Sequence, residues 1–302
     1  MYFQKNLQKN GVSDEVYSLI NDVQIRPSTH IIVTKCTAKY YLEESTPGLE
    51  ILIPKYYEFF PNTSKYTGYV CDATIGDFFN ALHCNACEPY ATLGGINDDN
   101  AENNQENANN DSASKSNNES IQGKRKTQNT GVAIFKSSKL VGELNSMETV
   151  CFLNIKNNVD MFLVSIPDPK DENDKIDIYL TPCKKPKIDV SIVNGTPYIK
   201  LDFNFSGKIY SMKQGSNYLS SDVLELIRKN CNNYLKMEFE NYLYKTTTVY
   251  QSDINGFGNY ASSSFLTTKA FNNYDWLNNY KNSCFEVNVN TIIDSGFILN
   301  ET

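Results

Sequence analysis

A histidine and two cysteines close together form the pattern in this sequence that could most readily do chemistry. Thiolate sulfur and imidazole nitrogen are preferred zinc ligands. Two cysteines with two residues between them also occur as redox pairs. The residues are His83, Cys84 and Cys87. A structural zinc site needs four ligands, but no second such pair exists, and Cys36 and Cys71 are scattered. We therefore expect buried free thiols and no metal, and keep a zinc or thiol module, or an extracytoplasmic enzyme, centred on these residues as the alternative function.

A glycine pattern late in the chain is the second candidate. Gly256, Gly258 and Ala261 fit the G-x-G-x-x-A pattern of dinucleotide-binding proteins. In those proteins the pattern follows a strand and opens a βαβ unit, whereas here it follows a long helical pattern. We interpret it as a turn at the helix exit. Both glycines would adopt conformations closed to other residues, and Phe257 would fill the core.

The rest of the sequence lacks the spacing of known catalytic motifs. It has two histidines, and no nucleophile elbow, HExxH sequence or phosphate-cradling loop. A formal net charge of −7 argues against nucleic acid as a partner. No run approaches the roughly 18 apolar residues of a membrane span. We predict a non-enzymatic protein without catalytic residues, cofactor or nucleic-acid partner.

These candidates must be positioned by regular elements, the main one being a long helix at about 221–250. Apolar residues recur there at spacings of three, four and seven, which is typical of a helix with one buried face. Strand patterns at 188–205 and 285–298 would cover that face, and Asn194-Gly195 predicts a tight hairpin turn in the first of them. The fold class that follows is α+β and multi-domain, with mixed or antiparallel sheets each packed with helices. Further strands are predicted at 31–34, 132–135, 140–144 and 176–180, and further helices at 12–24, 37–44, 74–82 and 145–153.

Three of the shorter helices carry a signal for their first turn, and Ser13-Asp14-Glu15 supply a plausible cap and an acidic first turn for the helix at 12–24. Thr74 can cap one of them, because its hydroxyl can accept a hydrogen bond from a free N–H group of the first turn. Asn145 and Glu148 have the spacing of a capping box at the start of another.

Composition divides the chain into three parts. Residues 97–130 are filled with Asn, Asp, Glu, Ser and Gln, and Ile121 is their one large aliphatic residue. Burial cannot offset the entropy cost of ordering such a segment, so we predict a disordered linker. It separates an N-terminal α+β domain at 1–96 from a C-terminal domain at 131–302, with a further subdivision near residue 183 left open.

The order of several short motifs in the C-terminal part resembles that of a known family. The motifs are the run from Gly131 to Leu144, the pair Glu148-Thr149, the turn that begins at Asp253, a tryptophan and a final alternating strand. This order is similar to that of the Ger(x)C family, the C subunits of bacterial spore nutrient-germinant receptors. A weaker resemblance covers 15–96. The positions that we expect to be structural motif residues are Gly131, Gly142, Asp253, Gly256, Phe257, Gly258, Trp276 and Gly296.

The resemblance implies a function and a place in the cell. A Ger(x)C protein is expected to be a lipid-anchored subunit on the outer surface of the spore inner membrane. It would assemble with the membrane-embedded A and B subunits and be required for germination in response to nutrients. Family members begin with a lipoprotein signal and a lipidated cysteine, and this sequence does not begin in that way. We therefore expect the lipid anchor to be absent from this chain.

Overall fold

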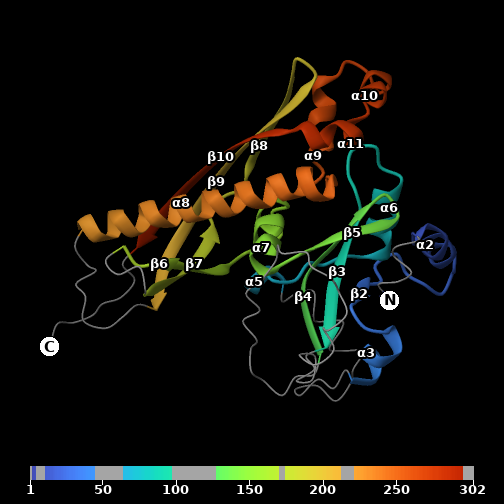
Figure 1. The fold of residues 1–302 in the computed structure, drawn as a ribbon, viewed down its shortest axis with the longest axis horizontal. Coiled ribbons are helices and arrows are strands. Elements are labelled where there is room, and N and C mark those ends of the chain that lie inside the picture. Colours follow the sequence, from blue (N-terminus) through green and yellow to red (C-terminus); the bar gives the residue numbers. More distant parts are fainter. Residues whose placement is uncertain are drawn as a thin grey trace, which may run out of the picture.

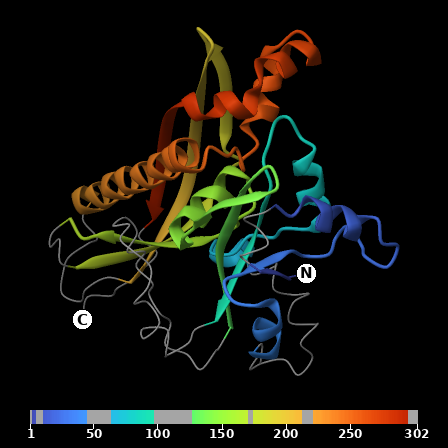
Figure 2. The ribbon, with the colours of Figure 1, turned by 45° about the vertical axis from the view of Figure 1, so that its right-hand side comes forward.

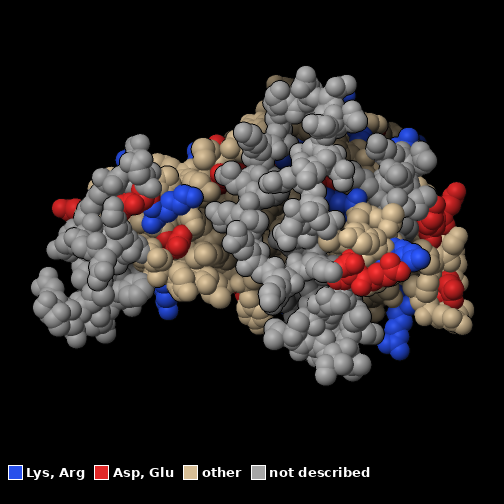
Figure 3. Space-filling view, turned by 60° about the horizontal axis from the view of Figure 1, so that its bottom comes forward, with Lys and Arg blue, Asp and Glu red and all other residues tan. Residues whose placement is uncertain are grey.

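The chain folds into two mixed β-sheets, each covered by helices (Figure 1). This arrangement confirms the predicted α+β class. The structure is a computed structural model, and it describes residues 2–4, 11–44, 64–96, 127–169, 174–211 and 221–294. Within these ranges no helix is long and apolar enough to cross a membrane. On the face shown in Figure 3, the visible Lys and Arg side chains are mixed with Asp and Glu.

The first sheet combines strands from the N-terminal part with a hairpin that follows the predicted linker. Its strands are β1 (Tyr2–Gln4), β2 (Ile32–Thr34), β3 (Tyr90–Ile96), β4 (Thr127–Lys136) and β5 (Lys139–Leu144), in that spatial order. The first three run parallel, and β4 and β5 are antiparallel additions. The helices of this part are α2 (Ser13–Ile20), α3 (Ala38–Glu44), α5 (Ser64–Thr67) and α6 (Ile75–Leu82).

Strand β4 is buried on both of its faces. Val132 and Ile134 point into a core shared with the C-terminal part of the chain. Ala133 and Phe135 point the other way, into a core formed with α2 and α6. A strand buried on both faces is expected to be continuously apolar, as these four residues are. The first sheet is therefore a middle layer, and the C-terminal part packs directly against it.

The second sheet is built around one long strand. Its strands are β6 (Phe162–Pro167), β7 (Lys175–Pro182), β8 (Lys187–Val193), β9 (Thr196–Ser211) and β10 (Cys284–Asp294). The order is β10-β9-β7-β6, and β8 pairs with the first half of β9. The final strand lies parallel to β9, whereas β7 and β8 are antiparallel to it. Inward and outward residues alternate along β9, as the predicted sheet with one solvent-facing side requires.

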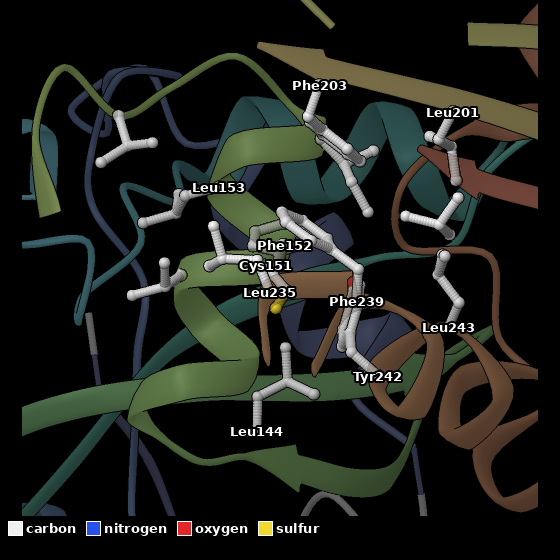
Figure 4. Packing of buried hydrophobic residues seen from close by; sticks show 14 of the residues in the cluster. Leu144, Cys151, Phe152, Leu153, Leu201, Phe203, Leu235, Phe239, Tyr242 and Leu243 are labelled. Carbon is white, nitrogen blue, oxygen red and sulfur yellow. The ribbon is translucent and has the colours of Figure 1, made fainter. Parts of the chain in front are cut away.

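The predicted long helix lies across the inner face of this sheet. It consists of α8 (Ser221–Lys245), continued by a π-helical segment η3 (Thr246–Tyr250). Its Phe239 ring stacks on Phe203 of β9 at a centroid distance of 4.1 Å. Figure 4 shows this contact among buried side chains from α7 (Ser146–Ile155), α8 and β9. The predicted helix at about 221–250 is confirmed, and its apolar face is covered by the sheet.

Short helices follow α8 and lead to the last strand. They are α9 (Phe257–Ala261), η4 (Ser262–Ser264), α10 (Thr268–Tyr274), α11 (Trp276–Asn279) and η5 (Tyr280–Asn282). The hairpin of β8 and β9 projects beyond α8 beside α10, as Figure 2 shows from a second direction. The Tyr274 hydroxyl fixes the hairpin tip by donating to the Gly195 carbonyl at 2.8 Å. Asn194 and Gly195 both have positive φ, at 51° and 83°, as the predicted hairpin turn requires.

Two of the three predicted helix caps are present, whereas α2 begins at Ser13 without a side-chain cap hydrogen bond. The Thr74 side chain accepts the Asp77 N–H at 3.1 Å at the start of α6. At the start of α7, Asn145 and Glu148 form the reciprocal capping box. The strands β1, β3 and β6 were not predicted. β3 contains two adjacent glycines, which weaken a strand pattern, whereas β6 does alternate and its pattern was missed.

The predicted linker is too long at its C-terminal end. Residues 127–130 lack large apolar side chains, but they form the start of β4, and residues 127–129 pair with residues 94–96 of β3. Backbone pairing in a sheet does not require apolar side chains, so composition could not reveal this extension. Residues 97–126 lie outside the described residues, and the division into domains at 1–96 and 131–302 stays a prediction.

Candidate functional site

The structure does not bring His83, Cys84 and Cys87 together with further ligands. His83 follows the last turn of α6, where its Nδ1 donates to the Phe79 carbonyl at 2.8 Å and its Nε2 accepts from the Tyr17 hydroxyl. Both ring nitrogens are thus already used. No three His, Cys, Asp or Glu side chains in the described ranges lie close enough to hold a metal ion.

Asp253 is the centre of a buried hydrogen-bond cluster. Its Oδ1 accepts the Gly256 N–H at 2.9 Å, and its Oδ2 accepts the Gly258 N–H at 2.9 Å and the Trp276 indole N–H at 2.8 Å. Its own carbonyl accepts the Glu88 N–H at 2.9 Å. Asp253 and Trp276 are each 1% exposed. Asp253 therefore fixes the glycine turn and the tryptophan through its carboxylate, and the segment before β3 through its backbone carbonyl.

The two glycines of this turn are required for different reasons. Gly256 has φ of 77°, in the left-handed region that favours glycine. Gly258 lies in α9 with no positive φ, which corrects the expectation that both have conformations closed to other residues. A side chain at Gly258 would overlap the Ala86 carbonyl and lie 2.6 Å from a ring carbon of Trp276. Phe257 between them is fully buried, as predicted.

Gly131 and Gly142 allow close approach at the β4-β5 hairpin. Gly131 has φ of 96°, and a β-carbon there would overlap the Leu144 carbonyl. A β-carbon on Gly142 would overlap the ring of Tyr250 from η3. The Tyr250 hydroxyl reaches past Gly142 and donates to the Glu143 carbonyl at 2.8 Å. The hairpin is therefore shaped to receive the end of the long helix.

Two further contacts join the same segments. The Ser252 hydroxyl donates to the Phe135 carbonyl at 2.6 Å, which ties the chain before Asp253 to β4. Lys245 near the end of α8 donates to the Glu148 carboxylate of α7 at 2.6 Å. Sequence reasoning missed Tyr250 and Ser252. Their role depends on a hairpin more than 100 residues away in the chain, for which the sequence carries no local signal.

Glu88 connects the first sheet to the glycine turn. Its backbone N–H reaches Asp253, and its Oε2 accepts the Ser137 N–H in the turn between β4 and β5 at 2.6 Å. Burial raises the pKa of this carboxyl to about 7, although the Ser137 N–H and the nearby Lys136 favour the charged form. Burial likewise raises the pKa of Asp253, against the hydrogen bonds from Gly258 and Trp276. Two buried carboxyl groups thus lie at one junction.

Comparison with known families identifies the group to which this chain belongs. The profile described as "Spore germination B3/ GerAC like, C-terminal" matches residues 130–296, and "Spore germination protein N-terminal domain" matches residues 1–94. The chain belongs to the GerAC-like, or Ger(x)C, family of spore germination proteins. A search of curated proteins found no match.

A solved structure supports the same fold. The structure titled "Crystal Structure of the GerBC protein" matches with a TM-score of 0.66 and 16% sequence identity, over 97% of this chain and 78% of that chain. At this identity the likeness shows the fold. The Ger(x)C resemblance inferred from the motifs is confirmed.

Asp253, Gly256, Gly258 and Trp276 lie together beside Glu88 and the β4-β5 turn, and we call this place the motif junction. It consists of Glu88, the β4-β5 hairpin, the turn 253–258 and Trp276. Gly296, the last of the expected motif residues, lies outside the described residues. A surface hollow of about 370 Å³ lies elsewhere, over β7 and β9 beside Tyr179 and Tyr210. The described polar groups of the junction bond mainly to one another, an arrangement suited to holding two sheets together.

Glu88 should make the stability of this junction depend on pH. A carboxyl whose pKa is about 7 when folded and 4.5 in its ordinary state binds a proton more tightly in the folded protein. Its contribution to stability is therefore full below pH 4.5 and is lost as the pH rises through about 7. Glu88→Gln retains an acceptor for Ser137 and does not titrate. We expect wild type to lose up to about 3 kcal/mol relative to Glu88→Gln between about pH 5 and pH 8.

Chemical denaturation at several pH values measures this difference. Glu43→Gln is the matched control, because the Glu43 side chain is 60% exposed, and its pH profile should follow wild type. Parallel profiles for wild type and Glu88→Gln would contradict the prediction.

Proposed function

We propose that this chain is the non-enzymatic C subunit of a spore nutrient-germinant receptor. It assembles with the membrane-embedded A and B subunits. A lipid anchor holds it on the outer surface of the spore inner membrane. There it is required for germination in response to nutrients.

The observation that supports this proposal best is how Asp253 is used. A catalytic carboxylate has to reach substrate, whereas Asp253 is 1% exposed and bonds to three donors of its own chain. The motif junction of this Ger(x)C chain thus resembles a structural core. A fixed relation between two sheets suits a subunit that presents a constant surface to partners.

Deletion of the gene in the parent organism tests the proposal. We expect normal sporulation and heat resistance, and a lost or slowed response to one set of nutrients, since the subunit acts only after the spore is built. Germination with a chemical trigger that bypasses nutrient receptors should be unchanged. Mutant spores that germinate normally on every nutrient, in a strain without other receptors, would contradict the proposal.

Complementation of the deletion links function to the motif junction. The wild-type gene and Asp189→Ala should both restore the response, because Asp189 lies on exposed β8 and pairs only with Lys187 among the described contacts. Asp253→Ala should fail, with reduced protein in the spore membrane fraction. Full restoration by Asp253→Ala at a normal protein level would show that the junction is dispensable.

A further inference from the structure

The segment Cys84–Cys87 forms a compact bend between α6 and β3. Within it, the Ala86 N–H donates to the Cys84 sulfur at 3.3 Å, which folds the backbone back over that sulfur. Cys87 is half-buried beside Cys84. Burial raises the pKa of the Cys87 thiol, and the neighbouring Cys84 raises it further. With only two residues between them, this bend keeps the two thiols within one turn of chain.

The same bend packs against the glycine turn of the motif junction. A β-carbon added to Gly256 would lie 3.6 Å from the Cys87 β-carbon, so little space separates the two segments. The Ala86 carbonyl occupies the space that a side chain at Gly258 would need. The next residue, Glu88, donates its N–H to the Asp253 carbonyl at 2.9 Å. A change in the backbone geometry of Cys84–Cys87 would therefore displace the backbone of Asp253–Gly258.

We propose that Cys84 and Cys87 form a redox site, in which a small-molecule disulfide such as oxidised glutathione converts the two thiols into an intramolecular disulfide. This inference does not depend on the proposed receptor function. Nothing in the motif junction needs these thiols as hydrogen-bond donors.

The reaction proceeds by two thiol–disulfide exchanges. Cys84 attacks first, because burial raises the pKa of the Cys87 thiol and so disfavours the Cys87 thiolate. A bond forms between the Cys84 sulfur and one glutathione sulfur, the glutathione S–S bond breaks, and a glutathione thiolate leaves. Cys87 then attacks the Cys84 sulfur and expels the second glutathione. Two electrons and two protons pass from the protein thiols to the two released glutathione molecules.

The other cysteines of the described chain do not offer such a pair. Cys71, Cys151 and Cys231 are buried, so an external disulfide cannot reach them. Cys183 and Cys284 are exposed, and Cys36 is partly buried. Cys36 follows β2 of the first sheet, Cys183 lies between β7 and β8, and Cys284 begins β10, so each can react singly. Oxidation under native conditions should therefore select Cys84 and Cys87 for an internal bond.

Mass spectrometry of the native protein treated with excess oxidised glutathione tests the proposal. The variant Cys36→Ser/Cys183→Ser/Cys284→Ser removes the other accessible thiols of the described chain and serves as the background. We expect loss of two thiols, a decrease of about 2 Da with no glutathione retained, and a disulfide mapped to Cys84 and Cys87. The melting temperature of the oxidised protein should rise by a few degrees, because the disulfide restrains the unfolded chain.

Single substitutions separate the two steps. Cys87→Ser should stop after the first exchange and keep glutathione on Cys84, whereas Cys84→Ser should react slowly, if at all, at Cys87. Neither variant should show the rise in melting temperature on oxidation. A protein that keeps all its thiols in excess oxidised glutathione, or whose internal disulfide joins another pair, would overturn the proposal.

Discussion

Asp253→Ala should lower the free energy of unfolding by about 3–5 kcal/mol, because it leaves three buried donors without their acceptor. These donors are the backbone N–H groups of Gly256 and Gly258 and the indole N–H of Trp276. Water cannot replace the carboxylate without opening the junction. Urea denaturation followed by the fluorescence of Trp276, the one tryptophan of the chain, reports directly on this site.

Two further variants separate the role of the carboxylate from general damage. Asp253→Asn keeps one acceptor oxygen but presents an amide donor to the remaining donors, so we expect a loss smaller than that of alanine but still above about 1 kcal/mol. Asp189→Ala removes an exposed ion pair with Lys187 and should change stability by less than about 1 kcal/mol. Equal effects of Asp253→Ala and Asp189→Ala would disprove the structural role of Asp253.

Gly258→Val should destabilise the protein by about 3 kcal/mol or more, since the new side chain would have to displace backbone. The obstacle is the Ala86 carbonyl, which cannot rotate away as a side chain could, and the Trp276 ring closes the other side. Thermal unfolding or the yield of soluble protein would show this effect.

The other glycines provide a graded comparison. Gly95 of β3 has nothing within 4 Å of a β-carbon position, so Gly95→Val should be near neutral. Gly256→Ala should cost about 1 kcal/mol through its positive φ, since its nearest obstacle is the flexible Asn259 side chain at 3.0 Å. If Gly258→Val were as mild as Gly95→Val, the packing between Ala86 and α9 would not be as described.

The sequence by itself determined the elements whose signals are local. The long helix at 221–250, the Asn194-Gly195 turn and the capping box of Asn145 and Glu148 depend on residues close together in the chain. Such signals can be recognised without knowing which part of the chain each element packs against. The order of the motifs likewise sufficed to identify the Ger(x)C family.

Only the tertiary structure decided how these elements meet. Helix α7 is buried on every side from Thr149 to Ile155, because it lies between the first sheet and α8. Its periodicity therefore could not show which face packs on which neighbour. Likewise, the hairpin of β4 and β5 completes the first sheet although it follows the predicted linker. Sheet membership depends on backbone pairing between distant segments, which composition does not encode.

The motif junction shows the same limit most clearly. The sequence marked Asp253, Gly258 and Trp276 as motif residues but did not show that the first hydrogen-bonds to the other two. No local pattern explains Gly142, whose lack of a side chain leaves room for the Tyr250 ring. The contact of Asp253 with Trp276 joins segments 23 residues apart in the chain, and that of Tyr250 with Glu143 joins segments 107 residues apart. They form only once both sheets are in place, so their physical cause is the packing of the whole chain and not any local pattern.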